Sequence, residues 1–276
     1  SDFSKRRIIP VLIKKFKNIK LAIASKTRFK LDKFDNVNWY NNYKRAVNNF
    51  KPDIVYISLP NSYHFKMGKY VLKRKINVII DKPICLNLKN AIELIKLSKQ
   101  NRCLVAESTI FNYHSQVSQA IKQIGGKRKI TNIQSLFCIP KPKKGNIKLS
   151  DKFAGGSIND MSPYAASIIR LFINKLPKKI FVTAKKGAKV YENFSILIKD
   201  KINMSGYFSH NDQYINQIQL FSKKKRIKLN RVFSPDPNLD CDLEIVEDNK
   251  TKKIKVKKES TFEKFFDQEI LIGLHQ

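Results

Sequence analysis

The sequence predicts an α/β protein in which a doubly wound parallel sheet is followed by an α+β domain with a large, mainly antiparallel open sheet. The first hundred residues alternate short apolar runs with helical periodicity, which is typical of βαβ units. After residue 108, short alternating runs follow one another with few helices, which indicates antiparallel strands. A chain of 276 residues is long enough for two domains, and we place them at 1–108 and 109–276.

Four apolar segments of the first domain are its expected strands. Residues 52–60 form a nearly continuous apolar run, which is typical of a strand buried on both faces. The other expected strands are 19–25, 76–81 and 103–108, and the expected helices are 40–50, 63–75 and 87–101. In a doubly wound sheet, ligands bind beyond the carboxyl ends of the strands, so the residues that follow each strand are the ones to examine for chemistry.

The second domain is expected to combine two helices with a run of strands. A helix near 113–124 precedes a strand near 130–139, and a glycine pair precedes a helix from Gly156 to about residue 174. Five short strands follow, at 179–186, 192–200, 202–210, 213–222 and 226–234. Because no helix separates these five segments, we expect them to pair as an antiparallel sheet.

The chain opens on what resembles a turn and a helix rather than a strand. A dinucleotide-binding Rossmann-type domain begins with a strand, a glycine-rich turn, and a helix whose amino terminus holds a pyrophosphate. Residues 1–16, SDFSKRRIIPVLIKKF, fit the turn and the helix. Without the first strand, which lies in the middle of such a sheet, two apolar edges would be exposed. We therefore expect the natural gene product to begin several residues before Ser1; the alternative is that residues 1–7 are only a helix cap.

Lys82, Asp160 and Tyr164 are the candidate reactive residues. Hydride transfer to or from an alcohol carbon needs a nicotinamide, a group that moves the hydroxyl proton, and a group that stabilises the developing alkoxide. Lys82 follows a buried strand and precedes Pro83, which restricts the backbone there. Asp160 and Tyr164 are four residues apart, so on a helix they share one face. A phenol has a pKa of about 10, and a nearby ammonium lowers it.

Several segments together resemble one enzyme family. Residues 53–83, DIVYISLPNSYHFKMGKYVLKRKINVIIDKP, and residues 106–116, AESTIFNYHSQ, resemble consecutive segments of the glucose-fructose oxidoreductase and inositol dehydrogenase (Gfo/Idh/MocA) family. Residues 154–164, AGGSINDMSPY, and residues 215–237 are similar to later segments of the same family. The resemblance implies an NAD(P)-dependent oxidoreductase that transfers a hydride between a nicotinamide cofactor and a sugar or nucleotide-sugar hydroxyl or ketone, in carbohydrate or surface-polysaccharide metabolism.

The resemblance also assigns site residues. Lys82 would contact the substrate hydroxyl and the nicotinamide ribose, and Asp160 and Tyr164 would be the aspartate and the acid/base on the long helix. The implied cofactor-binding residues are Ser1, Asp2, Phe3, Ser4, Lys5, Ser25, Lys26, Leu59, Pro60, Asn61, His64, Asp81, Lys82, Glu107 and Asn112. No metal is implied.

The residues after the second strand of the implied fold favour NADP over NAD. Ser25 and Lys26 stand where the adenosine ribose is recognised, and a hydroxyl and a cation suit a 2'-phosphate. The chain departs from the family pattern in Asp81, which replaces a usual glutamate, and in Asn112 and Ser115, which stand where arginine and proline are common. Family members also usually continue beyond residue 276.

The formal net charge of +33 suggests a nucleic-acid ligand as an alternative. However, lysines occur throughout the chain, and the basic stretches 141–148, 223–228 and 250–258 fall where turns, hairpins or an edge strand are expected. We therefore expect no nucleic-acid partner. The four cysteines lack disulfide or metal spacing, and no apolar run is long enough to span a membrane, so we expect a cytoplasmic protein with reduced thiols.

Two further expectations concern function and assembly. The alternative to an enzyme is a non-catalytic nucleotide-binding sensor or assembly protein on the same fold, because fold alone does not establish activity. The resemblance implies a homodimer or homotetramer formed through the sheet of the second domain.

Overall fold

The computed structural model describes residues 3–29, 31 and 37–274, and it divides the chain into two compact units. The first unit contains Ser1–Ser108 and also the segment that starts at Phe265, and the second unit is Thr109–Lys264. Assigning 109–276 to one domain therefore differs from this division. The segment from Phe265 belongs to the first unit because Phe266 packs edge-on against Tyr56, with ring centroids 6.3 Å apart, and Asp267 pairs with Lys15.

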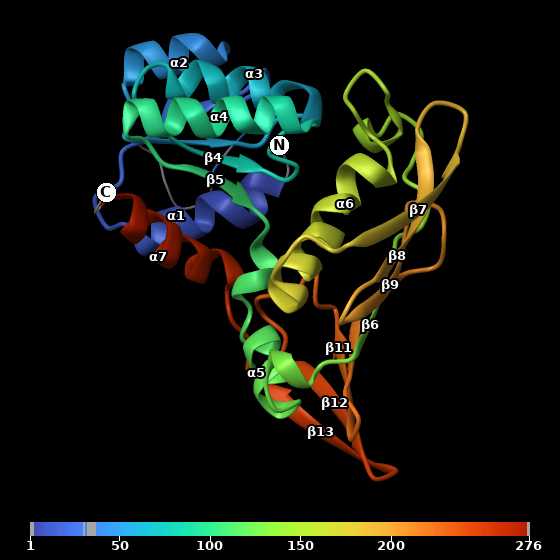
Figure 1. Cartoon of the computed structure of the whole chain (residues 1–276). Helices are drawn as coiled ribbons and strands as arrows, with labels where there is room; N and C mark the ends of the chain where they lie inside the picture. The colour runs from blue at the N-terminus through green and yellow to red at the C-terminus, as the bar shows by residue number, and fades with distance from the viewer. Residues whose placement is uncertain (1–2, 30, 32–36, 275–276) are drawn as a thin grey trace. The chain divides into compact units, whose positions relative to one another are not determined.

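The first unit contains two parallel sheets (Figure 1). One pairs β1 (Leu21–Ala24) with β2 (Val37–Tyr40), and the other has the order β3 (Ile54–Ile57), β4 (Asn77–Asp81), β5 (Val105–Ser108). Four of these strands fall within expected segments. The strand β2 was not expected, since four residues give too short a pattern to distinguish it from the start of the following helix.

The first unit also contains helical elements. They are the π-helical turn η1 (Ser4–Ile8), α1 (Ile9–Lys15), α2 (Tyr43–Phe50), α3 (Asn61–Leu72), α4 (Leu88–Asn101) and the part of α7 (Thr261–Leu274) from Phe265 onward. Asn42 and Asn87 cap α2 and α4 by accepting backbone N–H bonds, which satisfies donors that a helix start leaves unpaired. Gly68 lets α3 approach β4, because a Cβ there would lie 2.7 Å from the Ile80 side chain.

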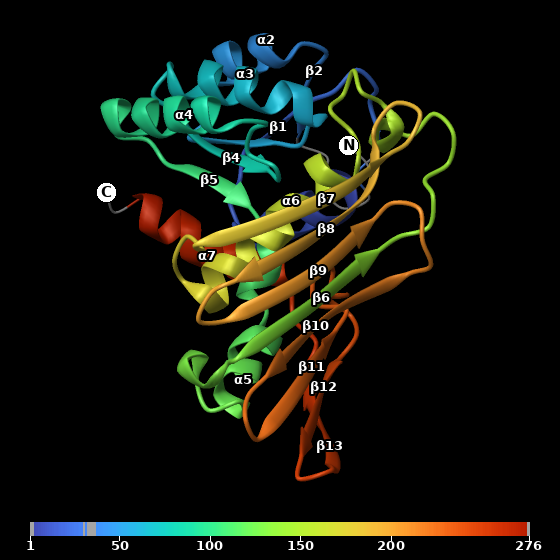
Figure 2. The same ribbon diagram turned by 45° about the vertical axis from the view of Figure 1, so that its right-hand side comes forward.

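The second unit is built on an eight-stranded sheet with the order β13-β12-β11-β10-β6-β9-β8-β7 (Figure 2). Only β6 and β9 pair in parallel, and the other neighbours are antiparallel. The strands are β6 (Asn132–Cys138), β7 (Lys179–Lys186), β8 (Tyr191–Lys199), β9 (Asn203–Ser209), β10 (Ile215–Phe221), β11 (Lys225–Asn230), β12 (Cys241–Glu247) and β13 (Lys250–Val256). A parallel sheet followed by a large, mainly antiparallel one confirms the predicted fold class.

Helical elements of the second unit lie before and between these strands. They are η2 (Ile110–Tyr113), α5 (Ser115–Gln123), η3 (Lys127–Lys129), η4 (Ile147–Leu149), α6 (Ser157–Ile168) and the π-helical turn η5 (Ile169–Ile173). The α6 helix packs against β8 and β9, and its apolar side meets the core through Met161, Ala165 and Ile168. A glycine at position 156 with φ +92° begins this helix.

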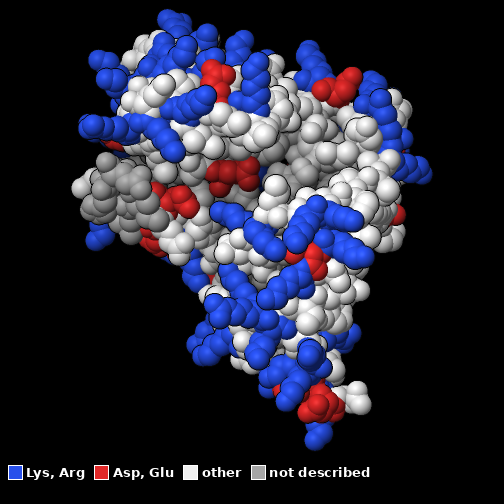
Figure 3. All heavy atoms as spheres, viewed as in Figure 1, with Lys and Arg blue, Asp and Glu red and all other residues white. Residues whose placement is uncertain are grey.

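Basic side chains cover much of the face shown in Figure 3. The edge strand β13 is one source, with four lysines in seven residues; its lysines discourage pairing with another chain. In the part of the chain that the structure describes, no helix combines the length and apolarity that crossing a bilayer requires. The same residues contain no group of histidine, cysteine and acidic side chains arranged to hold a metal ion.

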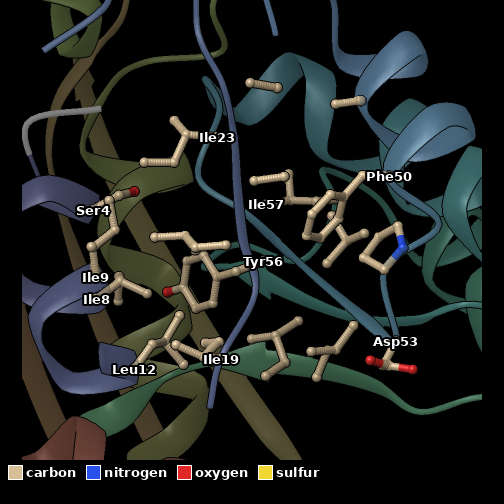
Figure 4. A pocket seen from close by; sticks show the side chains of 18 of the residues that line it. Ser4, Ile8, Ile9, Leu12, Ile19, Ile23, Phe50, Asp53, Tyr56 and Ile57 are labelled. Atoms are coloured by element: carbon tan, nitrogen blue, oxygen red, sulfur yellow. The ribbon is translucent and has the colours of Figure 1, made fainter. Parts of the chain in front are cut away.

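An apolar cavity of about 1150 Å³ lies between the two sheets of the first unit (Figure 4). Within the described residues β1 pairs only with β2, and β3 pairs only with β4, so each has one unpaired edge. The cavity is lined by both strands and by α1, including Ile9, Leu12, Ile23, Tyr56 and Ile57. The unpaired backbone groups of β1 and β3 lie beside apolar side chains, so the cavity can accept an additional strand more readily than a small polar ligand.

Candidate functional site

Lys82 follows β4 and is held at the carboxyl edge of the three-stranded sheet by its neighbours. The Pro83 carbonyl oxygen lies 2.7 Å from His64 Nδ1, and the Ile84 N–H donates to Glu107 Oε2 over 2.9 Å. The Lys82–Pro83 peptide is cis. The backbone on the carboxyl side of Lys82 is therefore bonded to both α3 and β5, so the lysine starts from a fixed position.

His64 supports this edge from inside. Its ring is fully buried, and Nε2 lies 2.7 Å from the Leu59 carbonyl oxygen, while Nδ1 contacts Pro83. Both ring nitrogens thus contact the protein backbone, which joins the loop after β3 to the residue that follows Lys82. Pro60 and Asn61 lie between these contacts, where Pro60 precedes the amino terminus of α3. The His64 ring therefore supports the segment that carries Pro60 and Asn61, and both of its nitrogens are already in contact with backbone carbonyls.

Asp81 connects the ends of the three parallel strands. Tyr56 of β3 donates its hydroxyl to Asp81 Oδ1 over 2.5 Å, and the same hydroxyl lies 2.8 Å from Ser108 Oγ of β5. Burial raises the pKa of Asp81 above its usual range. Burial, together with the adjacent Asp81 carboxylate, also raises the pKa of Tyr56 well above its ordinary value. The Tyr56 hydroxyl therefore holds the side chain of Asp81, the residue immediately before Lys82.

A polar cavity of about 440 Å³ lies at the carboxyl ends of β1 and β2. It contains the predicted pair Ser25 and Lys26 together with two arginines that the sequence analysis did not single out, Arg28 and Arg45. The Ser25 N–H donates to the Tyr40 carbonyl over 2.9 Å, which joins the two strand ends. Three cations in one small cavity suit a phosphate group. Sequence analysis missed Arg45 because it did not predict β2, the strand that precedes the helix carrying this residue.

The predicted residues at the start of the chain are only partly described. Ser1 and Asp2 lie outside the described residues. Ser4 and Lys5 belong to η1, with Phe3 immediately before it, and the Lys5 ammonium lies 5.5 Å from the centre of the Phe29 ring. These contacts hold the segment but do not define a phosphate turn.

Asp160 and Tyr164 lie one turn apart on α6 in the second unit, as their spacing predicts. Asp160 Oδ2 lies 2.5 Å from Lys148 Nζ and 2.9 Å from His210 Nε2. The Tyr164 ring packs among Phe111, Phe137 and Phe233, with centroid distances of 6.0, 5.2 and 5.1 Å. The aromatic contacts restrict the tyrosine ring, and the polar contacts restrict the aspartate.

Asn112 of η2 has a buried amide without a hydrogen-bond partner. Neither its nitrogen nor its oxygen is bonded in the structure, although both atoms are inaccessible to solvent. An unsatisfied buried polar group costs about 1–3 kcal/mol, so such a group indicates a ligand or a water at this place. Its role as a cofactor contact stays a prediction.

The candidate residues occur in two groups. Lys82 and its supporting residues belong to the first unit, and Asp160, Tyr164 and Asn112 belong to the second. Sequence analysis missed Lys148 and His210, since each lies on a segment distant in sequence from Asp160, and no local periodicity joins them.

Most of the known proteins that this chain resembles are named as oxidoreductases. The profile of an oxidoreductase family with an NAD-binding Rossmann fold matches residues 5–109. A dTDP-3,4-didehydro-2,6-dideoxy-alpha-D-glucose 3-reductase from Saccharopolyspora spinosa is 23% identical over 247 residues, which is 85% of this chain and 74% of the relative. D-xylose 1-dehydrogenase (NADP(+)) 2 from Haloferax volcanii is 23% identical over 52% of this chain and 45% of that protein.

Solved structures share the fold of the whole chain. KijD10, a 3-ketoreductase from Actinomadura kijaniata in complex with NADP and TDP-benzene, superposes with a TM-score of 0.88 at 21% identity, covering 100% of this chain and 89% of that one. An aldose-aldose oxidoreductase from Caulobacter crescentus gives a TM-score of 0.84 at 16% identity, covering 99% and 88%. At these identities the superpositions establish the fold alone.

Proposed function

We propose that the chain is an oxidoreductase of the Gfo/Idh/MocA family and that it transfers a hydride between NADP and a hydroxyl or ketone carbon of a sugar or nucleotide sugar. The observation on which the proposal depends is that each unit holds one half of the required chemistry in a fixed position. Lys82 is fixed at the edge of a parallel sheet, and Asp160 and Tyr164 are fixed on one helix face. The named activities of the relatives support the same reaction class.

The residues divide the proton chemistry among them. A nicotinamide bound at this site would supply or accept the hydride. Lys82 donates a hydrogen bond to the reacting oxygen and stabilises its negative charge, and Tyr164 gives that oxygen a proton in reduction and takes one in oxidation. Asp160 accepts a hydrogen bond from a substrate hydroxyl and so orients the sugar. These roles require Lys82 and Tyr164 to reach one oxygen, which is part of the proposal.

The cavity at the ends of β1 and β2 supports NADP as the cofactor. Lys26, Arg28 and Arg45 can neutralise a 2'-phosphate, and the Ser25 hydroxyl can bond to it. The N-terminus of α3, together with the Asn112 amide, offers donors elsewhere along the cofactor. A fluorescence titration should give tighter binding of NADPH than of NADH. Equal affinity for both, or tighter NADH binding, would contradict this assignment.

A substrate panel with matched variants tests the reaction. D-glucose, D-xylose, UDP-N-acetylglucosamine and dTDP-glucose would each be incubated with NADP⁺, and NADPH formation would be followed by absorbance. Lys82→Met and Tyr164→Phe should each abolish the turnover that the unaltered chain gives, while NADPH binding stays within about threefold, because neither change removes the cations of the phosphate cavity. NADPH binding without turnover of any sugar or sugar nucleotide would instead support the non-catalytic sensor.

We also propose that the chain forms a homodimer or homotetramer through its second-unit sheet and works in the cytoplasm. Phe181 of β7 and Leu197 of β8 are directly opposite each other on one face of the sheet and are 54% and 52% exposed, and exposed apolar patches often mark interfaces. All four cysteines are unpaired, in keeping with a reducing compartment. Light scattering should give a mass of at least two chains, and Phe181→Glu should lower it. A monomer at working concentration would contradict the assembly.

The basic surface fits anionic ligands of this kind. A positive surface raises the local concentration of nucleotides and speeds their encounter. The net charge of +33 can therefore be explained by attraction of an anionic cofactor and substrate, without a nucleic-acid partner.

A further inference from the structure

We propose that His210 and Lys148 are positioning residues of the reaction, which act by fixing the Asp160 carboxylate on the face of α6 that carries Tyr164. The inference rests on the proposed function, because it deepens the role given to Asp160. Both side chains contact the same oxygen, Asp160 Oδ2, over 2.9 Å from His210 Nε2 and 2.5 Å from Lys148 Nζ. Two donors on one oxygen fix the direction of the carboxylate more firmly than one.

His210 is held in place by two strands. It directly follows β9, and its backbone N–H donates to the Glu192 carbonyl of β8 over 2.8 Å. The residue is only 2% exposed, so the imidazole has no alternative position in solvent. The α6 helix is joined to the same region, because the Ser157 hydroxyl donates to the Tyr191 carbonyl over 3.2 Å. The distance between His210 and Asp160 is therefore set by the fold of the second unit.

Lys148 reaches Asp160 because two glycines allow its loop to pack on the start of α6. The Gly156 N–H donates to the Lys148 carbonyl over 2.8 Å. A Cβ at Gly155 would lie 2.5 Å from the Lys148 carbonyl oxygen, a distance that backbone atoms cannot tolerate. The glycine pair is thus needed for the approach of Lys148, in addition to starting the helix.

The hydrogen-bond chemistry determines which atom of His210 carries a proton. An ionised carboxylate only accepts, so His210 Nε2 must be the donor to Asp160. His210 Nδ1 is buried and has no hydrogen-bond partner in the structure. The ring therefore acts on the site through Nε2–H, and it orients Asp160 without taking part in proton transfer.

The consequence for catalysis is geometric. Asp160 and Tyr164 are one helical turn apart, so a substrate hydroxyl bonded to a misplaced Asp160 would carry the reacting carbon away from Tyr164. A displacement of about 1 Å can cost about a hundredfold in rate. Losing the Nε2–H donor should therefore lower kcat rather than weaken cofactor binding.

Three variants separate positioning from a general structural role. His210→Ala should lower kcat about 10- to 100-fold. His210→Gln, whose amide N–H can occupy the place of Nε2–H, should restore activity to within about threefold of the unaltered chain. The neighbouring Asn211→Ala is the control, since its side chain bonds to Glu192 rather than Asp160. In an Asp160→Ala background, His210→Ala should cause no further loss, because no side-chain oxygen remains at position 160 to accept from Nε2–H.

A measurement that needs no substrate accompanies the kinetics. In the full chain with ¹⁵N-labelled histidine, assigned by means of His210→Gln, the imidazole spectrum of His210 should show a protonated Nε2 that shifts in Asp160→Asn. An unprotonated Nε2, or a spectrum unchanged in Asp160→Asn, would overturn the inference. So would equal kcat for His210→Ala and Asn211→Ala while Tyr164→Phe is inactive. Full activity of Tyr164→Phe would instead defeat the proposed function, and the spectrum would still decide the His210–Asp160 pair.

Discussion

Replacing Tyr56 by phenylalanine removes one hydroxyl and keeps the ring. That hydroxyl bonds to Asp81 over 2.5 Å and to Ser108 over 2.8 Å, and so joins three strands. A hydrogen bond to a charged group contributes about 1.5–3 kcal/mol and a neutral one about 0.5–1.5 kcal/mol. Asp81 keeps a second bond from Ser58, which reduces the loss. We expect Tyr56→Phe to lower the free energy of unfolding by about 2–3 kcal/mol.

The assay is urea unfolding followed by tryptophan fluorescence. Trp39, the only tryptophan, lies on β2 in the first unit and therefore reports the unfolding of that unit. Tyr70→Phe is the matched control, because its hydroxyl makes one exposed bond, to Asn48, over 2.9 Å. That change should cost less than about 1 kcal/mol. If Tyr56→Phe lost no more stability than Tyr70→Phe, the linking role of the Tyr56 hydroxyl would be refuted.

Three other predictions follow from the first unit. Burial raises the folded-state pKa of Asp81 above its unfolded value, so the contribution of Asp81 to stability is present below the unfolded pKa and is lost as the pH rises through the folded pKa. The free energy of unfolding of the unaltered chain, relative to that of Asp81→Asn, should therefore fall over that pH range. A difference in urea midpoints that stays constant with pH would contradict this. Arg45→Gln should weaken NADPH binding about tenfold and leave NADH binding unchanged. Lys44→Gln is the control, because Lys44 does not line the cavity. Equal effects of the two changes on NADPH binding would exclude Arg45 from a phosphate site. Adding an apolar five-residue strand and a glycine turn ahead of Ser1 should raise the melting temperature, because the added strand can pair with the unpaired edges of β1 and β3. The same extension with alternate residues changed to lysine should not raise it. Equal melting temperatures of the two extended chains would show that the cavity does not accept a strand.

The elements that sequence analysis predicted are those whose pattern is local. The βαβ alternation gave β3, β4 and β5 and the helices between them, and the spacing of Asp160 and Tyr164 correctly predicted their shared helix. The fold class is confirmed by the superposed structures, and the profile of an oxidoreductase family with an NAD-binding Rossmann fold matches residues 5–109, as the resemblance implies.

The missed features depend on contacts between distant segments. Lys148 and His210 meet at Asp160 from a loop and a strand end, 12 and 50 residues away, and nothing in either local sequence indicates the other. Arg45 joins Lys26 only because β1 and β2 are parallel and end together. The strand β12 was not expected either, although the turn residues of 234–238, SPDPN, precede it and its apolar residues alternate with polar ones.

His64 shows that a motif position can have a supporting role. The resemblance placed it among cofactor contacts, whereas both its ring nitrogens meet backbone carbonyls of Leu59 and Pro83. A residue can thus belong to a motif because it supports the loops that bind a ligand. Only coordinates distinguish that role from direct contact, since the sequence pattern is the same.

A crystal structure of the chain with NADP⁺ bound would test the central proposal most directly. The quantities to measure are the distances from Lys82 Nζ and Tyr164 Oη to a common point beside the nicotinamide ring. Our account predicts one position within about 3 Å of both atoms, where a substrate oxygen can sit. Lys82 and Tyr164 on separate surfaces, or a nicotinamide bound away from either residue, would contradict it.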